Sequence, residues 1–182
     1  MNYATIKNCD IANGPGVRVS LFVSGCTHHC PGCFNQVAWD FDYGEPFTQD
    51  VIDQILGMLA PRHIQGLTLL GGEPFEPQNQ GPLVDLLRQV KEKHPEKSIW
   101  AFSGYLFDRD ILPGRLGPKE VTEELLGYLD VLVDGPFIES KKDLTLRFRG
   151  SSNQRLINVP QSLATGNIVL WEDWQGNTRG MK

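Results

Sequence analysis

The sequence has neither an excess of basic residues nor a long apolar run. Its 182 residues include 17 Lys and Arg against 22 Asp and Glu, a formal net charge of −5. It therefore lacks the clustered positive charge with which general nucleic-acid-binding proteins neutralise phosphates. No apolar stretch approaches the roughly 20 residues that span a bilayer, and the N-terminus lacks the basic-then-apolar pattern of a signal peptide. We expect a cytoplasmic protein that binds neither nucleic acid nor a membrane.

Cysteine is scarce, yet three of the four cysteines lie close together. The segment SGCTHHCPGCFN (24–35) contains Cys26, Cys30 and Cys33 and offers no fourth cysteine nearby. In a reducing compartment this grouping favours metal binding or catalysis over a disulfide framework. Cys9 lies in a separate segment with strand character, and because free cysteine is commonly a small buried hydrophobe, we expect it in the core.

The three clustered cysteines are compatible with more than one kind of metal or redox site. A structural zinc ion needs four closed ligands, so Cys9, His28 or His29 would have to supply the fourth. A redox thiol site is a further alternative. Three thiolates alone suit a four-iron cluster in which one iron stays open to a ligand from outside the protein. The spacing favours the iron–sulfur cluster over zinc, and His28 and His29 are then ordinary loop residues.

Apolar runs typical of strands alternate along the chain with segments whose apolar residues recur at helical spacing. The clearest strand is VRVSLFV (17–23), which alternates strictly and ends just before the cysteine segment. Further strands are expected at 67–70, 98–102, 130–134, 156–159 and 168–171, and helices at 48–60, 82–94 and 118–129. No repeat or low-complexity linker interrupts this order.

Repeated strand–helix–strand units predict right-handed crossovers and a parallel sheet covered by helices. A closed eight-fold barrel typically takes ~250 residues, so we expect an α/β fold in the form of an open partial (β/α) barrel, with about five or six mainly parallel strands. We expect residues 1–182 to form one domain. Ligands should gather where the strands end, and there the chain reads SGC, GGEPF, SGY and GPF. These four glycine-bearing loops are expected to ring one mouth.

The Cys26-x3-Cys30-x2-Cys33 spacing resembles the signature of radical S-adenosylmethionine (SAM) enzymes. The surrounding sequence is similar to one family among these enzymes, the activating proteins of anaerobic ribonucleoside-triphosphate reductases. That resemblance rests, in chain order, on NGPGVR (13–18), LFVSGCTHHCPGCFN (21–35), GGEP (71–74), SGY (103–105), LVDGPF (132–137) and RGSSNQR (149–155). It covers about residues 1–155, which leaves the residues after about 155 as a C-terminal extension. One departure is Gly32, where the superfamily often has an aromatic residue; here the aromatic residue is Phe34.

The resemblance implies the cofactors. A [4Fe-4S] cluster would be held by Cys26, Cys30 and Cys33, and SAM would bind its open iron through the methionine amino and carboxylate groups. The turn Gly71, Gly72 and Glu73 would approach the ammonium group with carbonyl and carboxylate acceptors. Gly32, Cys33 and Phe34 would lie beside the cofactor, although Phe34 also suits a core position. No catalytic residue is implied beyond the cluster and the cofactor.

The resemblance also implies the reaction and the partners. Reductive cleavage of SAM would give a 5′-deoxyadenosyl radical, which removes hydrogen from a glycine of the anaerobic reductase and leaves a glycyl radical. A low-potential donor such as a flavodoxin or ferredoxin would supply the electron. Two alternatives stay open: a radical SAM enzyme acting on a small molecule, and a non-catalytic zinc or iron–sulfur module.

Two features outside the cysteine segment have no settled role. Asp134 in LVDG suits either a contact with the cofactor or a turn. Residues 139–155 contain five basic residues against two acidic ones within an acidic chain. That segment is either a solvated surface or one that steers an acidic surface of the reductase, in which case Lys141 and Lys142 would take part.

Overall fold

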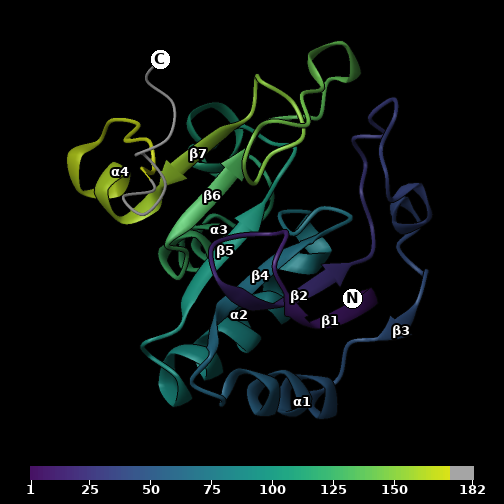
Figure 1. The fold of residues 1–182 in the computed structure, drawn as a ribbon, viewed down its shortest axis with the longest axis vertical. Coiled ribbons are helices and arrows are strands. Elements are labelled where there is room, and N and C mark those ends of the chain that lie inside the picture. Colours follow the sequence, from purple (N-terminus) through teal and green to yellow (C-terminus); the bar gives the residue numbers. More distant parts are fainter. Residues whose placement is uncertain (173–182) are drawn as a thin grey trace.

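The computed structural model describes residues 1–172, which form one mixed seven-stranded sheet with helices (Figure 1). The strands are β1 (Asn2–Asp10), β2 (Val17–Val23), β3 (Glu45–Pro46), β4 (Ile64–Gly71), β5 (Ser98–Phe102), β6 (Val131–Asp134) and β7 (Arg155–Asn158). The α-helices are α1 (Gln49–Leu59), α2 (Pro77–Lys93), α3 (Lys119–Gly127) and α4 (Val159–Thr165). Short helical turns lie at η1 (Gln36–Trp39), η2 (Phe107–Ile111) and η3 (Glu139–Lys141).

The sheet has a parallel centre and antiparallel edges. Its strand order is β3-β1-β2-β4-β5-β6-β7, in which β2, β4, β5 and β6 run parallel. β1 and β3 extend one edge and β7 the other, all by antiparallel pairing. The α/β class and the parallel centre are confirmed. The expected strand count is too low. Strand character was expected around Cys9, but β1 was not counted in the sheet, and β3 was not expected at all.

Two expectations about single segments are wrong. Residues 168–171 form no strand, since Leu170 makes only an isolated bridge with Ile157. Cys9 is exposed rather than part of the core. Its φ of 62° falls where the β1–β2 register is irregular between Lys7 and Asp10, and such an irregularity locally disrupts the alternation of side chains along a strand.

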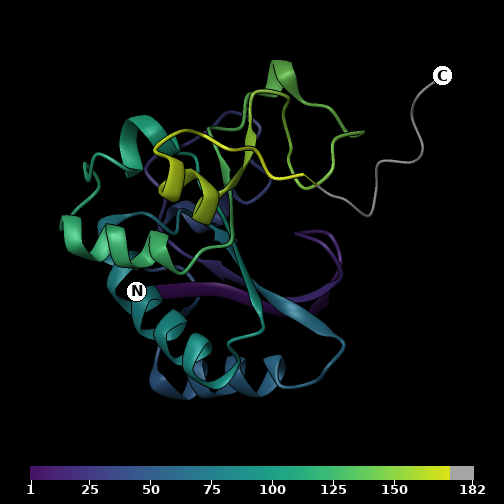
Figure 2. The same cartoon turned by 90° about the vertical axis from the view of Figure 1, so that its left-hand side faces the viewer.

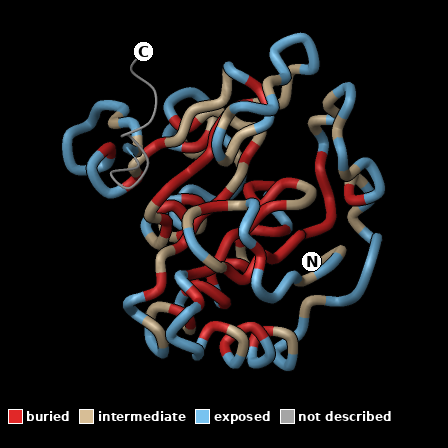
Figure 3. The backbone as a smooth tube through the Cα atoms, in the orientation of Figure 1, coloured by how far each residue is buried: buried red, intermediate tan, exposed pale blue. Residues whose placement is uncertain are grey.

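The three longer helices cover one face of the sheet (Figure 2). Alternation along β2 places Val19, Leu21 and Val23 on this face, where they join Ile55 of α1 and Leu87 of α2 in the main core. Burying each such side chain contributes roughly 1.5–3 kcal/mol. Buried residues are accordingly concentrated in the central strands and on the inner sides of the helices (Figure 3). This layer holds the parallel strands, and therefore the loops at their ends, in place.

The opposite face of the sheet carries aromatic side chains and a buried arginine. Trp100 contacts Phe148 and Trp171 edge to face, with ring centroids 5.5 Å and 4.9 Å apart. Arg18, fully buried near the start of β2, places its guanidinium 5.6 Å from the Trp100 ring. Its Nε donates to the Thr68 hydroxyl at 2.8 Å. Burial lowers the pKa of Arg18 to about 10, so the group stays cationic at neutral pH.

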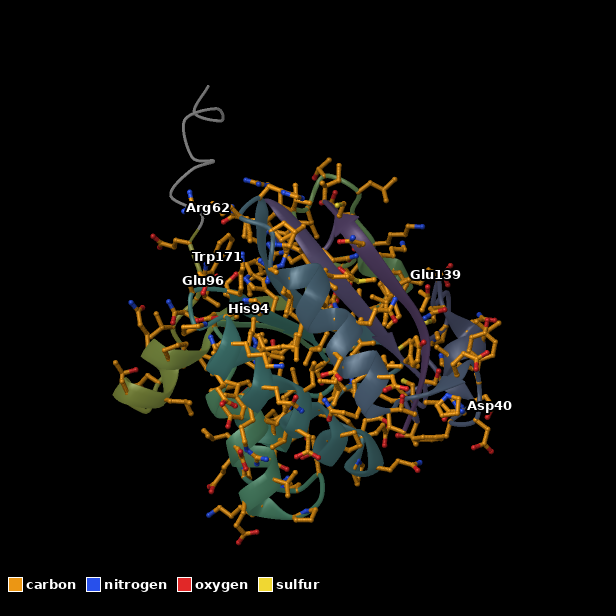
Figure 4. All side chains as sticks on the ribbon, turned by 90° about the horizontal axis from the view of Figure 1, so that it is seen from below. Asp40, Arg62, His94, Glu96, Glu139 and Trp171 are labelled. Atoms are coloured by element: carbon orange, nitrogen blue, oxygen red, sulfur yellow. The ribbon has the colours of Figure 1, made fainter. Side chains whose placement is uncertain are left out.

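The N-terminal and C-terminal ends of the parallel strands lie on opposite sides of the molecule. Figure 4 places Arg62, His94 and Glu96, which precede β4 and β5, far from Asp40 and Glu139, which follow β2 and β6. The C-terminal ends of the parallel strands therefore share one side, where α/β folds carry their functional loops. Within residues 1–172, no helix has the length and apolar character needed to cross a membrane.

Candidate functional site

A cavity of about 460 Å³ opens at the C-terminal ends of the parallel strands. Its volume falls within the ~300–1,000 Å³ typical of small-molecule sites. All four loops predicted to ring one mouth contribute to its lining: Cys26, Cys30, Cys33 and Phe34 after β2; Gly71, Gly72 and Glu73 after β4; Ser103 and Gly104 after β5; Gly135 and Phe137 after β6. The expectation of one shared mouth is confirmed.

The three clustered cysteines line this cavity to different depths. Cys26 is buried, whereas Cys30 and Cys33 are half-buried. Burial raises the pKa of Cys26 to about 12, and burial also raises the pKa of Cys30. Since a metal binds the thiolate, metal binding must release these protons.

The cysteines do not converge on a single point. Among residues 1–172, no three His, Cys, Asp or Glu side chains lie close enough together to hold one metal ion. Each thiolate of a four-iron cluster binds a different iron, so three ligands to a cluster need not meet at one point. Three thiols around an open cavity are a donor set that fits such a cluster.

Backbone hydrogen bonds fix the start of the cysteine segment. The Gly25 N–H donates to the Ala38 carbonyl at 2.8 Å, and the Cys26 N–H to the Trp39 carbonyl at 3.2 Å. Gly25 adopts φ 93°, and a Cβ at this position would lie 2.1 Å from the Phe41 ring. A glycine is therefore required where β2 turns into the cysteine segment.

The glycine turn after β4 packs directly against the same segment. The Gly72 N–H donates to the Val23 carbonyl at 2.7 Å, and the Glu73 N–H to the Gly25 carbonyl at 2.8 Å. A Cβ on Gly72 would lie 2.4 Å from the Gly25 carbonyl oxygen. The sequence suggested that these glycines admit a ligand; in the structure they let two backbones meet, and the contact with a ligand stays a prediction.

The Glu73 carboxylate is already occupied by the protein. It is 1% exposed and accepts hydrogen bonds from the Phe75 N–H, the Ser103 hydroxyl and the Gly104 N–H, at 2.7–2.9 Å. His28 Nε2 lies 3.1 Å from its second oxygen. Burial lowers the pKa of His28, but the hydrogen bond and charge of Glu73 outweigh burial and leave that pKa raised. His28 is a loop residue as expected, yet it has a defined partner.

Phe34 and Gly32 lie at the edge of the cavity. The Phe34 side chain is 85% exposed, so the core alternative for this residue is wrong. Gly32 has φ 74°, and a Cβ there would lie about 3.1 Å from the Glu139 carboxylate carbon. Glycine in place of an aromatic residue thus lets the cysteine segment approach η3.

Comparison with known proteins identifies the family. Residues 12–157 match the family described as "4Fe-4S single cluster domain". The chain is 44% identical over 156 residues to the anaerobic ribonucleoside-triphosphate reductase-activating protein of Enterobacteria phage T4, covering 86% of this chain and 93% of that one. It is 42% identical to the protein of that name from Escherichia coli K12, over 85% and 96% of the two chains. The chain belongs to the reductase-activating-protein family.

The Pasteurella multocida member of the reductase-activating-protein family is 41% identical over 163 residues, or 88% of this chain and 99% of the relative. The family match and the cavity overlap in the chain, because residues 12–157 include all four loops that line the mouth. The iron–sulfur interpretation of the three cysteines therefore agrees with the family's description.

In this reductase-activating family member, sequence reasoning missed the contacts of Glu76 and Tyr105 with the cysteine segment. The Glu76 carboxylate is 4% exposed and accepts from the Thr27 N–H at 2.8 Å and the Thr27 hydroxyl at 2.6 Å. The Tyr105 hydroxyl lies 3.5 Å from the same oxygen. Glu76 stands at the start of α2, and no periodic pattern indicates that its side chain turns back toward the cysteines.

Asp134 and the RGSSNQR motif act together. Asp134 is fully buried, accepts from the Phe107 N–H at 2.8 Å and pairs with Arg155. The Asn153 amide donates to the Pro136 carbonyl, and the Gln154 amide to the Gly135 carbonyl. The motif thus fixes the loop that follows β6, which forms one side of the cavity.

Proposed function

We propose that this protein activates an anaerobic ribonucleoside-triphosphate reductase by radical SAM chemistry. The observation that carries the proposal is the shared cavity, in which three cysteines and the glycine turn face one space at the ends of parallel strands. The family supports the same function, since its named members are reductase-activating proteins. The proposal includes a radical SAM type of partial barrel, which the parallel centre of the sheet supports.

In the proposed site, Cys26, Cys30 and Cys33 hold a [4Fe-4S] cluster. When bound, the cluster supplies the electron that cleaves the SAM sulfonium into methionine and a 5′-deoxyadenosyl radical. The backbone of Gly71, Gly72 and Glu73 would accept hydrogen bonds from the SAM ammonium group. The Glu73 side chain already has four hydrogen-bond donors around it. It would therefore act mainly by fixing the positions of the neighbouring loops.

The remaining lining residues would exclude water and admit the partner. Leu70, Phe102 and Phe148 are among the lining residues and contribute apolar surface to the cavity. Gly32, Cys33 and Phe34 would stand beside the cofactor at the mouth. The open side would receive a glycine-bearing segment of the reductase, on which the glycyl radical forms. A flavodoxin or ferredoxin would supply the electron.

The test is anaerobic reconstitution with iron and sulfide, followed by reduction and addition of SAM, with and without the reductase. We expect 5′-deoxyadenosine in both cases and an organic radical only with the reductase. Cys26→Ala, Cys30→Ala and Cys33→Ala should lose the cluster, whereas Cys9→Ser, at an exposed cysteine far along β1, should keep it. Loss of the cluster in Cys9→Ser, or zinc as the bound metal, would contradict the proposal. SAM cleavage without a reductase radical would instead favour a small-molecule substrate.

A further inference from the structure

The segment between Cys26 and Cys30 has only three residues, and two of them are held by buried carboxylates. Thr27 is bound twice, through its N–H and its hydroxyl, by one oxygen of Glu76. His28 is bound by Glu73, and its ring contacts the Tyr105 ring at a tilt of 59°, with centroids 4.2 Å apart. The conformation that separates the first two cysteines is therefore set by side chains from outside the segment.

Both carboxylates come from the turn between β4 and α2. Glu73 belongs to the glycine turn itself, and Glu76 is three residues further on, at the start of α2. The Glu76 side chain makes no capping hydrogen bond to its own helix; its carboxylate oxygen accepts from Thr27 instead. The positive end of the helix dipole favours a carboxylate at this position.

The same two carboxylates reach the loop after β5. Glu73 accepts from the Ser103 hydroxyl and the Gly104 N–H, and the Tyr105 hydroxyl lies beside Glu76. A Cβ on Gly104 would lie 2.6 Å from the His28 ring, so the loops are in close contact. Burying two carboxylates is costly unless hydrogen bonds compensate. Apart from the Phe75 N–H in the same turn, the compensating donors come from the cysteine segment and the β5 loop.

We propose that Glu76, with Glu73, is a positioning residue that holds the Cys26–Cys30 segment in register with the glycine turn. The inference rests on the proposed function, because that register matters only if the cysteines hold a cluster and the glycine turn holds SAM. Removal of groups that orient metal ligands typically costs ~10- to 100-fold in affinity or activity. Loss of the Glu76 acceptor should therefore disturb both the cluster and SAM binding.

The decisive variants are Glu76→Leu, which removes the acceptor, and Glu76→Gln, which keeps one oxygen in place. Thr27→Val is a milder variant, since Thr27 is exposed and keeps its N–H bond to Glu76, losing only the hydroxyl contacts with Glu76 and Tyr105. The matched control is Gln80→Leu, one turn further along α2. Gln80 is fully buried and bound to the Phe75 and Leu116 carbonyls but lies outside the cysteine contacts.

Each full-length protein is reconstituted anaerobically, and three quantities are measured: iron content, the electron paramagnetic resonance spectrum of the reduced protein with and without SAM, and SAM affinity. Glu76→Leu should bind SAM ~10- to 100-fold more weakly and show an altered spectral response to SAM. Glu76→Gln should recover most of both, and Thr27→Val should shift them less in the same direction. Gln80→Leu should lower the unfolding temperature while its spectrum and SAM affinity match those of the parent.

The possible failures are distinguishable. If the parent itself binds no cluster or does not respond to SAM, the proposed function and this inference both fall. If the parent responds and Glu76→Leu and Thr27→Val match it, the inference alone is overturned. It is also overturned if Gln80→Leu changes the spectrum as much as Glu76→Leu, because general loosening of α2 would then explain the effect. Should Glu76→Leu not fold, Thr27→Val and Glu76→Gln decide.

Discussion

Arg155 at the start of β7 donates to Asp134 at the end of β6, from Nε to Oδ1 at 2.9 Å, and its Nη2 donates to Asp108 at 2.7 Å. One guanidinium thus joins the last parallel strand to the turn η2. Asp134 is fully buried, so Arg155 supplies the charge that compensates it. The sequence was compatible with Asp134 either contacting the cofactor or forming a turn. Neither alternative included its pair with Arg155.

Removing Arg155 should destabilise the fold strongly. Arg155→Leu leaves the Asp134 carboxylate buried without its cation, and we expect the free energy of unfolding to fall by roughly 2–4 kcal/mol in urea denaturation. Adding Asp134→Asn to Arg155→Leu should recover part of the loss. The matched control is Arg88→Leu, since Arg88 also pairs with two carboxylates but is 55% exposed, and it should change stability little. Equal effects of Arg155→Leu and Arg88→Leu would contradict the role of burial.

The Asp108–Arg155 pair should give a pH-dependent contribution. The hydrogen bond from Arg155 is the largest cause that holds the pKa of Asp108 below its ordinary value. A carboxylate whose pKa is lower in the folded protein stabilises above its ordinary pKa of ~3.9, and this contribution is lost as pH falls through the folded pKa. The stability difference between the parent and Asp108→Asn should therefore be present at pH 7 and shrink toward pH 3. Urea titrations across that range test it, and a constant difference would exclude the mechanism.

The elements that the sequence predicted best are those with a strict pattern. β2 follows its alternation residue for residue, and α1 departs from the expected helix by one residue at each end. α2 begins at Pro77, five residues before the expected start at 82. Its first turn carries buried polar residues such as Asn79 and Gln80, which give no apolar period to detect. The two-residue strand β3 is too short for any pattern.

Gly72→Ala should weaken both the fold and the cysteine segment. The added Cβ would lie 2.4 Å from the Gly25 carbonyl and 2.9 Å from the Ala38 carbonyl, and backbone cannot yield as a flexible side chain can. We expect a loss of ~1–3 kcal/mol and lower iron content after reconstitution. Gly57→Ala, in α1 with open space around the position, should instead stabilise by ~0.5–1 kcal/mol. Parent-like stability and iron content in Gly72→Ala would show that the two backbones can separate.

The sequence predicted the candidate ligand residues of the site, but it did not predict the side chains that hold the cysteine segment in place. Cysteine spacing and glycine turns are local patterns, and the parallel topology brings them to one edge, so Cys26 and Gly72 could be placed together from the sequence. Contacts such as Thr27 with Glu76 join residues 49 positions apart through side-chain orientation. Spacing carries no information about such a contact, and it becomes visible only when α2 is placed against the cysteine segment.

Basic residues lie on one side of the cavity mouth. Lys141 and Lys142 are exposed beside Leu144, which is 89% exposed, and Lys142 and Leu144 line the cavity. Exposed charge beside an apolar residue suits the approach of an acidic, partly apolar surface of the reductase. Lys141→Glu with Lys142→Glu should slow association with the reductase ~10-fold or more at low salt, because steering acts on the encounter rate. The effect should shrink as salt shortens the screening length.

The control for this pair is Lys93→Glu with Lys119→Glu, which makes the same change in net charge on α2 and α3, the helices that cover the other face of the sheet. Association kinetics across ionic strength and the glycyl-radical yield are measured for both double variants. SAM cleavage without the reductase should match the parent in the Lys93 and Lys119 variant, because neither residue lines the cavity. In the Lys141 and Lys142 variant it is measured separately, because Lys142 lines the cavity, and the association rate is compared only for protein that cleaves SAM. If the two double variants slow association equally, net charge alone explains the effect. If neither slows it, the basic residues at the mouth are a solvated surface and the reductase docks elsewhere.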